Sequence, residues 1–414
     1  MKQYNYPVRY INAPSVKICP ADIFKQRVVK MEEYAKMTSP ITGETGIDGV
    51  LLDFNYGLRL QIPEGNWHVK ISDAESEYVF IDDDISAATL ISWEKFFIEW
   101  EVILWLDGEP VFYHQFDPHG QQVHFRFPTK TLGDTLALLP YVEAFRKQFD
   151  CTVTCTVEDV FYDILDRYYP NVRRTPDLPD DSYACFYMQF AFNFPFETTE
   201  DAAAVPMLRF GRSILRRVMQ APKVIFTPTK PREIQEPYVC IAVHASCTSK
   251  SWLNPNGWST VVAYLKELGY RVLCIDKNRV CTNHGMTVEQ PEGVEDMSGD
   301  YDLIDRVNQI AYADFFIGVG SGLSWLAWAV DVPVIMISGI SEPWYEFDTP
   351  YRVHNPLVCH GCFNLVRDRD SLFFCPFFRG KKQAFQCSKK ISARQVIEAI
   401  DRLVADHNLL RGSS

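Results

Sequence analysis

Four cysteines in the last sixth of the chain have the spacing of a metal site. They read C-x2-C-x12-C-x11-C, from Cys359 through Cys362 and Cys375 to Cys387. Four thiolates can form a tetrahedron around zinc or iron, and such a site leaves no open position for a substrate. We therefore predict a structural metal site. The ligand type does not choose between zinc and iron, and reduced cysteines without a metal are the alternative.

A single carboxylate, Asp134, lies between a predicted strand at 122–127 and a predicted helix at 135–149. Open α/β sheets bind their ligands where strands end and helices begin. An aspartate there could act as a general base that removes a proton from an acceptor hydroxyl. The alternative is a plain helix N-cap, which aspartate also favours.

The segment 315–339 predicts a strand, a glycine turn, a helix and a second strand. It reads FFIGVGSGLSWLAWAVDVPVIMISG, with the turn at Gly318, Gly320 and Gly322. A strand that turns sharply into a helix leaves backbone N–H groups free, and these suit a phosphate. The spacing is not GxGxxG, so a standard dinucleotide fold is not favoured. The alternative is a βαβ unit that needs small residues at its turn.

Lys250 follows a predicted strand at 238–243, in the loop HASCTSKSW. A lysine close to a helix N-terminus could hold a diphosphate. A solvated surface lysine is the alternative.

The pattern of elements predicts three domains. Residues 50–116 alternate between polar and apolar, which is typical of a small antiparallel barrel or sandwich. We assign a β-barrel-like module to 1–118, with Asp82, Asp83 and Asp84 as an acidic turn between strands or, less favoured, a metal site. Strands and helices then alternate, which predicts two parallel sheets. The two α/β domains are 119–232 on the acceptor side and 233–414 on the nucleotide side, the latter with the cysteine finger 359–387.

Composition excludes several classes of function. The chain has 414 residues, a net charge of −12 and no long run of lysine or arginine, so nucleic-acid binding is disfavoured. The stretch 315–330 is uncharged but shorter than the roughly 20 residues of a membrane span. The first residues, MKQYNYPVRYINAP, lack the apolar core of a signal peptide, so a cytoplasmic protein is expected.

Three segments resemble the heptosyltransferases of glycosyltransferase family 9, in that family's order. They are TLGDTLALLPYVEAF (131–145), HASCTSKSW (244–252) and FIGVGSGLSWLAWAVDVPVIMISG (316–339). With the N-terminal β module and the C-terminal cysteines, the chain most resembles the bacterial autotransporter heptosyltransferases. The resemblance implies a GT-B fold, in which two Rossmann-like domains face each other across a cleft. It also implies ADP-heptose as donor and serine hydroxyls of an autotransporter adhesin passenger domain as acceptors.

The resemblance further implies a cytoplasmic, dodecameric enzyme with one iron per subunit. By position, Asp134 matches the general base of an inverting transfer. Lys250 and the turn at Ser321 and Gly322 would hold the diphosphate without a divalent cation, and Met297 would lie beside the adenine. The complete set of candidate substrate-binding residues is Thr131, Leu132, Gly133, Ser246, Lys250, Met297, Gly320, Ser321 and Gly322.

The sequence departs from the family at two positions. Family 9 lipopolysaccharide enzymes usually carry aspartate where this chain has Gly320, and histidine where it has Trp325. These departures suggest a different acceptor or sugar pose. They also motivate one rival function, a nucleotide-binding scaffold that has lost catalysis. A separate rival keeps the enzyme but gives it another nucleotide sugar or a lipopolysaccharide acceptor. Asp368 and Asp370 imitate the DxD motif of metal-dependent glycosyltransferases, but a charged loop is favoured there.

Overall fold

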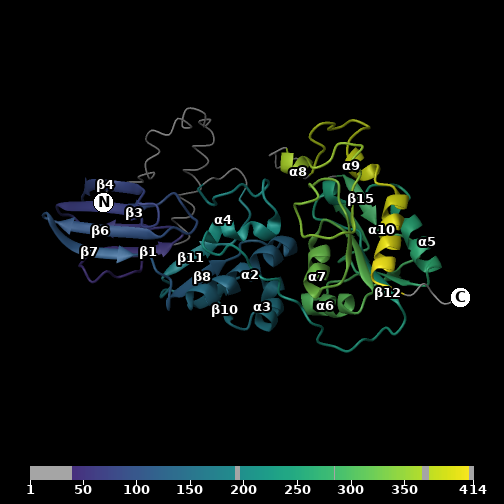
Figure 1. Cartoon of the computed structure of the whole chain (residues 1–414), viewed down its shortest axis with the longest axis horizontal. Helices are drawn as coiled ribbons and strands as arrows, with labels where there is room; N and C mark the ends of the chain where they lie inside the picture. Colours follow the sequence, from purple (N-terminus) through teal and green to yellow (C-terminus); the bar gives the residue numbers. More distant parts are fainter. Residues whose placement is uncertain (1–39, 192–195, 284, 366–372, 410–414) are drawn as a thin grey trace.

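The structure is a computed structural model that describes residues 40–191, 196–283, 285–365 and 373–409. The N-terminal stretch on which the signal-peptide prediction rests lies outside these residues, as do Asp368 and Asp370. The described chain forms three parts in a row, a β module, a middle α/β domain and a C-terminal α/β domain (Figure 1).

The β module contains a four-stranded antiparallel sheet in the order β4-β3-β6-β7. Its inner face buries Trp67, Val69 and Ile71 of β3, because alternate side chains of a strand point to the same face. The order leaves β4 and β7 as open edges, so the predicted barrel is not found among the described strands. The strands are β3 (Trp67–Asp73), β4 (Val79–Ile85), β6 (Trp100–Leu106) and β7 (Glu109–Gln115).

The prediction of an acidic turn at residues 82–84 is wrong. Asp82, Asp83 and Asp84 lie within strand β4 and pair with β3. Asp82 and Asp84 are close to the ring nitrogens of His68 on the neighbouring strand, at 2.8 and 2.9 Å. These cross-strand contacts place the carboxylates on a sheet rather than in a loop.

The middle domain is built on a seven-stranded sheet in the order β10-β9-β8-β11-β1-β2-β5. Strand β2 runs antiparallel to its two neighbours, β1 and β5, and all other neighbouring strands pair in parallel. Three of the strands come from the region assigned to the β module, so the two parts share one sheet. The boundary at residue 118 stays a prediction. The strands are β1 (Leu51–Asn55), β2 (Arg59–Ile62), β5 (Ala88–Ile91), β8 (Gln122–Arg126), β9 (Thr152–Thr156), β10 (Val172–Arg174) and β11 (Ala184–Tyr187).

The C-terminal domain is built on a six-stranded parallel sheet in the order β16-β13-β12-β17-β18-β19. Every residue of β12, β17 and β18 is buried, as expected for parallel strands that are covered by helices on both faces. A two-stranded hairpin of β14 (Val280–Asn283) and β15 (Met286–Glu289) was not predicted. The sheet strands are β12 (Tyr238–Ala242), β13 (Arg271–Cys274), β16 (Glu295–Asp296), β17 (Phe315–Val319), β18 (Val334–Ile337) and β19 (Arg352–Val353).

The helix predicted at 135–149 corresponds to α2. Residues 207–215 form a 3₁₀ turn followed by a short helix, and the positive φ of Arg216, 26°, ends that helix. The helices and 3₁₀ turns are α2 (Leu132–Phe149), η2 (Asp159–Phe161), α3 (Tyr162–Tyr168), η3 (Met207–Arg209), α4 (Gly211–Leu215), η4 (Thr248–Lys250), α5 (Gly257–Glu267), α6 (Leu303–Ala311), α7 (Gly322–Val330), α8 (Cys362–Leu365), α9 (Gln386–Lys389) and α10 (Ala393–Asp406).

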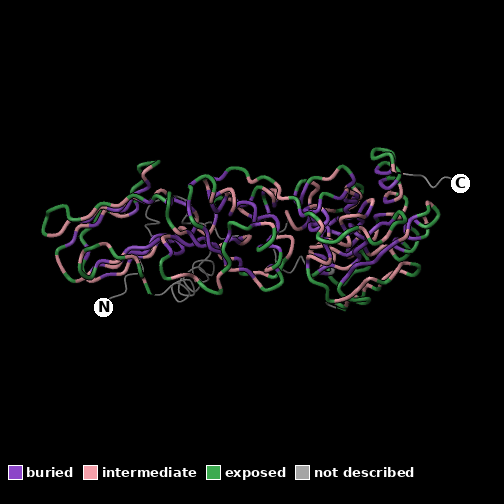
Figure 2. Tube along the Cα trace, turned by 90° about the horizontal axis from the view of Figure 1, so that it is seen from below, coloured by how far each residue is buried: buried purple, intermediate pink, exposed green. Residues whose placement is uncertain are grey.

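The two α/β domains touch through helices and backbone hydrogen bonds. Helix α2 packs against α7, and a buried core continues from the middle domain into the C-terminal one (Figure 2). The backbone N–H of Met207 donates to the carbonyl of Tyr345 at 2.8 Å. The N–H of Phe226 donates to the carbonyl of Ala329 at 2.9 Å. None of the described helices is long and apolar enough to cross a lipid bilayer.

Candidate functional site

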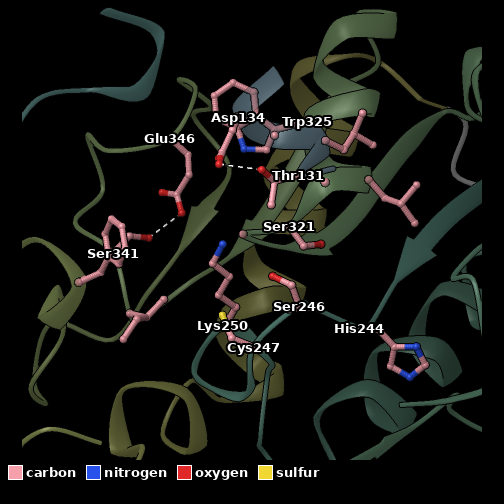
Figure 3. A pocket seen from close by; sticks show the side chains of 18 of the residues that line it. Thr131, Asp134, His244, Ser246, Cys247, Lys250, Ser321, Trp325, Ser341 and Glu346 are labelled. Carbon is pink, nitrogen blue, oxygen red and sulfur yellow. Dashed lines mark hydrogen bonds between the residues drawn. The ribbon is translucent and has the colours of Figure 1, made fainter. Parts of the chain in front are cut away.

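A cavity of about 590 Å³ lies between the two α/β domains (Figure 3). Its wall combines the start of α2, the loop after β12, the turn between β17 and α7, and the loop after β18. The structure brings eight of the nine predicted substrate-binding residues together with Asp134 around it. Those that line the cavity are Thr131, Leu132, Gly133, Asp134, Ser246, Lys250, Gly320, Ser321 and Gly322.

Met297 is the predicted site residue that does not line this cavity. Its backbone N–H donates to the carbonyl of Cys274 at 3.0 Å, and its carbonyl accepts from Arg306 at 2.9 Å. These contacts hold the Met297 backbone beside strand β13. The role beside an adenine stays a prediction.

Asp134 occupies the third position of helix α2 and does not cap it. The N-cap residue is Thr131, whose side chain makes no capping hydrogen bond. The Thr131 hydroxyl instead donates to Oδ2 of Asp134 at 2.8 Å. The alternative that Asp134 serves as a plain N-cap is therefore excluded, and its carboxylate is directed at the cavity (Figure 3).

The surroundings of Asp134 raise the pKa of its carboxyl above the value of an ordinary aspartate. The side chain is half-buried, since one side opens to the cavity while protein atoms surround the rest. Burial raises the pKa of the Asp134 carboxyl, and this effect is opposed by the charge of Lys250 and the hydrogen bond from Thr131. A carboxylate with a raised pKa is a stronger base, so it accepts a proton more readily from a hydroxyl.

Lys250 reaches the cavity from the other domain. It closes the short turn η4, and its side chain is half-buried. Figure 3 shows its amine in the middle of the cavity, between Asp134 and Ser321. Ser246 lies in the same loop and is exposed. The surface-lysine alternative is not supported, because the ammonium group faces the cavity.

The glycine turn forms a helix start that faces the same space. Strand β17 ends at Val319 and helix α7 begins at Gly322, with Ser321 as its N-cap in an extended conformation. The Ser321 side chain makes no capping hydrogen bond. The first N–H groups of the helix have no intrahelical partner, so they can bind an anion.

Several cavity residues were missed by the sequence analysis. Asp276 lies two residues after β13 and accepts from the backbone N–H groups of Val243 and His244, at 2.8 and 3.2 Å. Its position just beyond the end of a parallel strand is the signal that could have found it. Tyr345 and Glu346 lie further along the loop after β18, where no such signal marks them.

The four cysteines predicted to hold a metal lie near one another. Three are buried and Cys359 is exposed. Burial, followed by the neighbouring thiols of Cys362, Cys359 and Cys375, raises the pKa of Cys387 to about 12. The donor set suits a soft metal ion such as zinc or iron. In the described part of the chain, however, no three histidine, cysteine or acidic residues are placed to hold an ion, so the metal site is not confirmed.

Two family models match separate parts of the chain. Residues 46–108 match the N-terminal domain of glycosyltransferase TibC. Residues 200–359 match glycosyltransferase family 9 (heptosyltransferase). The first match falls within the region assigned to the β module, and the second begins near the end of the middle domain and extends over most of the C-terminal domain.

Individual relatives are similar over most of the chain. The autotransporter heptosyltransferase BAHTCr of Citrobacter rodentium is 37% identical over 374 residues, which is 88% of this chain and 91% of that protein. TibC of Escherichia coli O78:H11 is 37% identical over 87% of this chain and 91% of its own length. BimC of Burkholderia thailandensis, an inactive autotransporter heptosyltransferase, is 31% identical over 86% of each chain.

A solved structure extends the likeness to the fold. Dodecameric iron-containing heptosyltransferase TibC, in complex with ADP-D-β-D-heptose, superposes with a TM-score of 0.85 and 36% identity. The match covers 90% of this chain and 100% of that one. Taken with the two facing α/β domains and the cavity between them, these similarities establish that the chain is a glycosyltransferase and belongs to the autotransporter heptosyltransferase family.

Proposed function

We propose that this protein transfers heptose from ADP-heptose to serine hydroxyls of an autotransporter adhesin. The observation that carries the proposal is one cavity in which Asp134 of one domain faces Lys250 and the start of α7 in the other. A base on one side and a diphosphate site on the other are what a glycosyl transfer needs. The ADP-heptose bound to the related TibC supports this choice of donor.

In the proposed reaction, Asp134 accepts the proton of the serine hydroxyl as its oxygen attacks the anomeric carbon of the heptose. The bond between that carbon and the phosphate oxygen breaks on the opposite face, so the configuration inverts and ADP leaves. The raised pKa of Asp134 favours proton transfer to it.

Lys250 and the N–H groups at the start of α7 would stabilise the charge that develops on the departing diphosphate. Fixed positive groups of this kind act most strongly in a cavity that excludes water. The protein supplies them from its own chain, so we propose that catalysis requires no divalent cation.

The proposal extends to the metal and the assembly. Cys359, Cys362, Cys375 and Cys387 would hold one structural iron ion per subunit, with zinc as the alternative. A thiolate site without an open position stabilises the fold and does not take part in transfer. TibC is described as iron-containing and dodecameric, and we propose the same assembly here, in the cytoplasm.

One rival function has a specific observation in its favour. BimC, at 31% identity, is an inactive member of the family, so a nucleotide-binding scaffold without activity is possible on this fold. The presence of Asp134 and Lys250 around one cavity favours the enzyme. A lipopolysaccharide acceptor is the second rival, and it would use the same cavity.

The test is to incubate the purified protein with ADP-heptose and an adhesin passenger domain, and then to weigh the adhesin by mass spectrometry. We expect the mass of one heptose residue at each modified serine, and a much smaller modified fraction after the same time with the Asp134→Asn variant. A different mass increment would identify another donor sugar. No increment at saturating donor would support the scaffold, and transfer to lipopolysaccharide alone would support the second rival.

A further inference from the structure

A second carboxylate, Glu346, lies in the cavity wall in addition to Asp134. It belongs to the loop after β18, and only 7% of its surface is exposed. In the view of Figure 3 its carboxylate is drawn beside that of Asp134, with the amine of Lys250 close to both. Burial of a charged side chain costs free energy unless partners compensate it, so its surroundings indicate what it does.

Two partners hold the Glu346 side chain in place. The Ser341 hydroxyl donates to Oε1 at 2.6 Å. The guanidinium of Arg352 lies 2.8 Å from Oε2, and both side chains of this ion pair are buried. Arg352 also donates to the Ser341 hydroxyl at 3.1 Å. The hydrogen bond and the ion pair position the carboxylate and balance its negative charge, while Oε2 accepts no hydrogen bond from the described part of the chain.

Gly320 leaves the space that this carboxylate occupies. A Cβ built on Gly320 would lie 2.8 Å from Oε1 of Glu346, closer than real Cβ contacts allow. Gly320 is not among the glycines with positive φ, so its backbone does not require glycine. A side chain at position 320 would therefore push against the end of the Glu346 side chain and displace its carboxylate.

The location indicates which ligand group Glu346 could bind. Gly320 begins the turn that we propose holds the diphosphate, so the sugar attached to that diphosphate would lie within reach of Oε1. A carboxylate repels phosphate oxygens and accepts hydrogen bonds only. Sugar hydroxyls are donors, and a hydrogen bond to an ionised acceptor is stronger than one between neutral groups.

We propose that Glu346 is a specificity-determining residue, which accepts a hydrogen bond from a hydroxyl group of the donor's sugar while Ser341 and Arg352 hold it in position. The inference rests on the proposed function, because it assumes a nucleotide sugar in this cavity. In this division of roles, Glu346 recognises the sugar. Lys250 and the turn before α7 recognise the diphosphate.

The first test compares the binding of ADP and of ADP-heptose by calorimetry without acceptor. Glu346→Gln should weaken ADP-heptose binding about tenfold or more, since a charged hydrogen bond is lost, and should leave ADP binding unchanged. The control is Asp348→Asn, which removes an exposed carboxylate from the same loop. It should change neither affinity.

The second test moves the carboxylate from the loop after β18 to the turn between β17 and α7. Gly320→Asp alone should weaken ADP-heptose binding, because its side chain meets Glu346 at like charge. Glu346→Ala alone should weaken it as well. The double variant should recover a large part of the lost affinity, because the new aspartate occupies the space that Glu346 leaves. If Glu346 only supported the fold, the double variant would not regain affinity for ADP-heptose relative to ADP.

The outcomes separate this inference from the proposed function. Equal ratios of ADP to ADP-heptose affinity in wild-type protein and a folded Glu346→Gln variant would overturn the inference, while transfer by wild-type protein would still stand. Failure of wild-type protein to bind or transfer heptose would overturn the proposed function itself. If Glu346→Gln does not fold, Ser341→Ala replaces it, with a smaller loss of ADP-heptose affinity expected and an unchanged affinity ratio as the contrary result.

Discussion

Gly133 of helix α2 lies directly against the indole ring of Trp325 in helix α7. A Cβ on Gly133 would lie 2.8 Å from Cδ1 of that ring. A second close contact joins the same two helices, because a Cβ on Gly322 of α7 would lie 2.8 Å from the Cβ of Leu132 in α2. The start of α2, which carries Asp134, is therefore in close contact with the start of α7, which carries the proposed diphosphate turn. Each helix start has a glycine at the point of contact.

Gly133→Ala should therefore destabilise the protein. The added methyl group meets a buried indole, and overpacking of this kind typically costs about 1–3 kcal/mol. Urea unfolding measures the loss. The double variant with Trp325→Phe should lose less than the sum of the two single changes, because a smaller ring gives the methyl group room. If the loss of unfolding free energy in the double variant equalled the sum of the two single losses, Gly133 and Trp325 would not be in contact.

Asp134→Asn should lower the rate of transfer by about 10²- to 10⁴-fold, the usual contribution of a general base. Its affinity for ADP should not change, since the proposed diphosphate contacts come from the other domain. The measurement is the initial rate of adhesin modification, with ADP affinity from calorimetry. Asp163→Asn, on the exposed surface of α3, is the matched control and should keep the wild-type rate.

The rate of transfer should depend on pH through Asp134. Its folded-state pKa is raised by burial, so the carboxyl begins to be protonated at a higher pH than an ordinary aspartate. The base is active when ionised, and the rate should fall as the pH drops through that raised pKa. A profile of kcat against pH measures this. If kcat of the Asp134→Asn variant fell over the same pH range, the titrating group would be a residue other than Asp134.

The same pKa shift predicts a sign for stability. A carboxyl whose pKa is higher in the folded state binds its proton more tightly there, so its ionised form destabilises the fold. This cost is present above the folded-state pKa and is lost as the pH falls through it. Asp134→Asn should consequently be at least as stable as wild-type protein at neutral pH. A lower Tm of the variant at that pH would contradict the burial effect.

Lys250→Met should weaken ADP binding about tenfold or more, because a charge-assisted contact to phosphate is lost. The loss should shrink at high salt, which screens the lysine charge in wild-type protein. Calorimetry at two salt concentrations measures both effects. Lys390→Met, an exposed lysine that does not line the cavity, is the control. Unchanged ADP affinity in Lys250→Met would remove this lysine from the diphosphate site.

Cys375→Ser should lower the metal content of the purified protein and reduce its Tm, since a structural metal contributes to folding free energy. Elemental analysis should find about one iron per wild-type subunit if the four cysteines bind it as proposed. The control is Cys151→Ser, a buried cysteine of the middle domain that should leave the metal content unchanged. Full metal content in Cys375→Ser would place the metal elsewhere.

Local patterns in the sequence were enough to predict most of the regular structure. The alternation of apolar residues and the position of glycines predicted a strand, a turn, a helix and a strand within 315–339, which is the observed order of β17, α7 and β18. These elements form where the sequence places them because their hydrophobic periodicity and turn residues act over a few neighbouring positions. For the same reason, Asp134 and Lys250 could be recognised as candidates from their places beside a strand or helix.

Contacts between distant segments could not be read from the sequence. The joining of β1, β2 and β5 to the sheet of the middle domain depends on pairing with β11, more than a hundred residues later. The place of Glu346 beside Gly320 depends on the path of a loop after β18 and on an ion pair with Arg352. The sequence by itself determined the elements and the chemical groups available. Only the tertiary structure decided which groups meet, because their meeting depends on how whole sheets and helices pack.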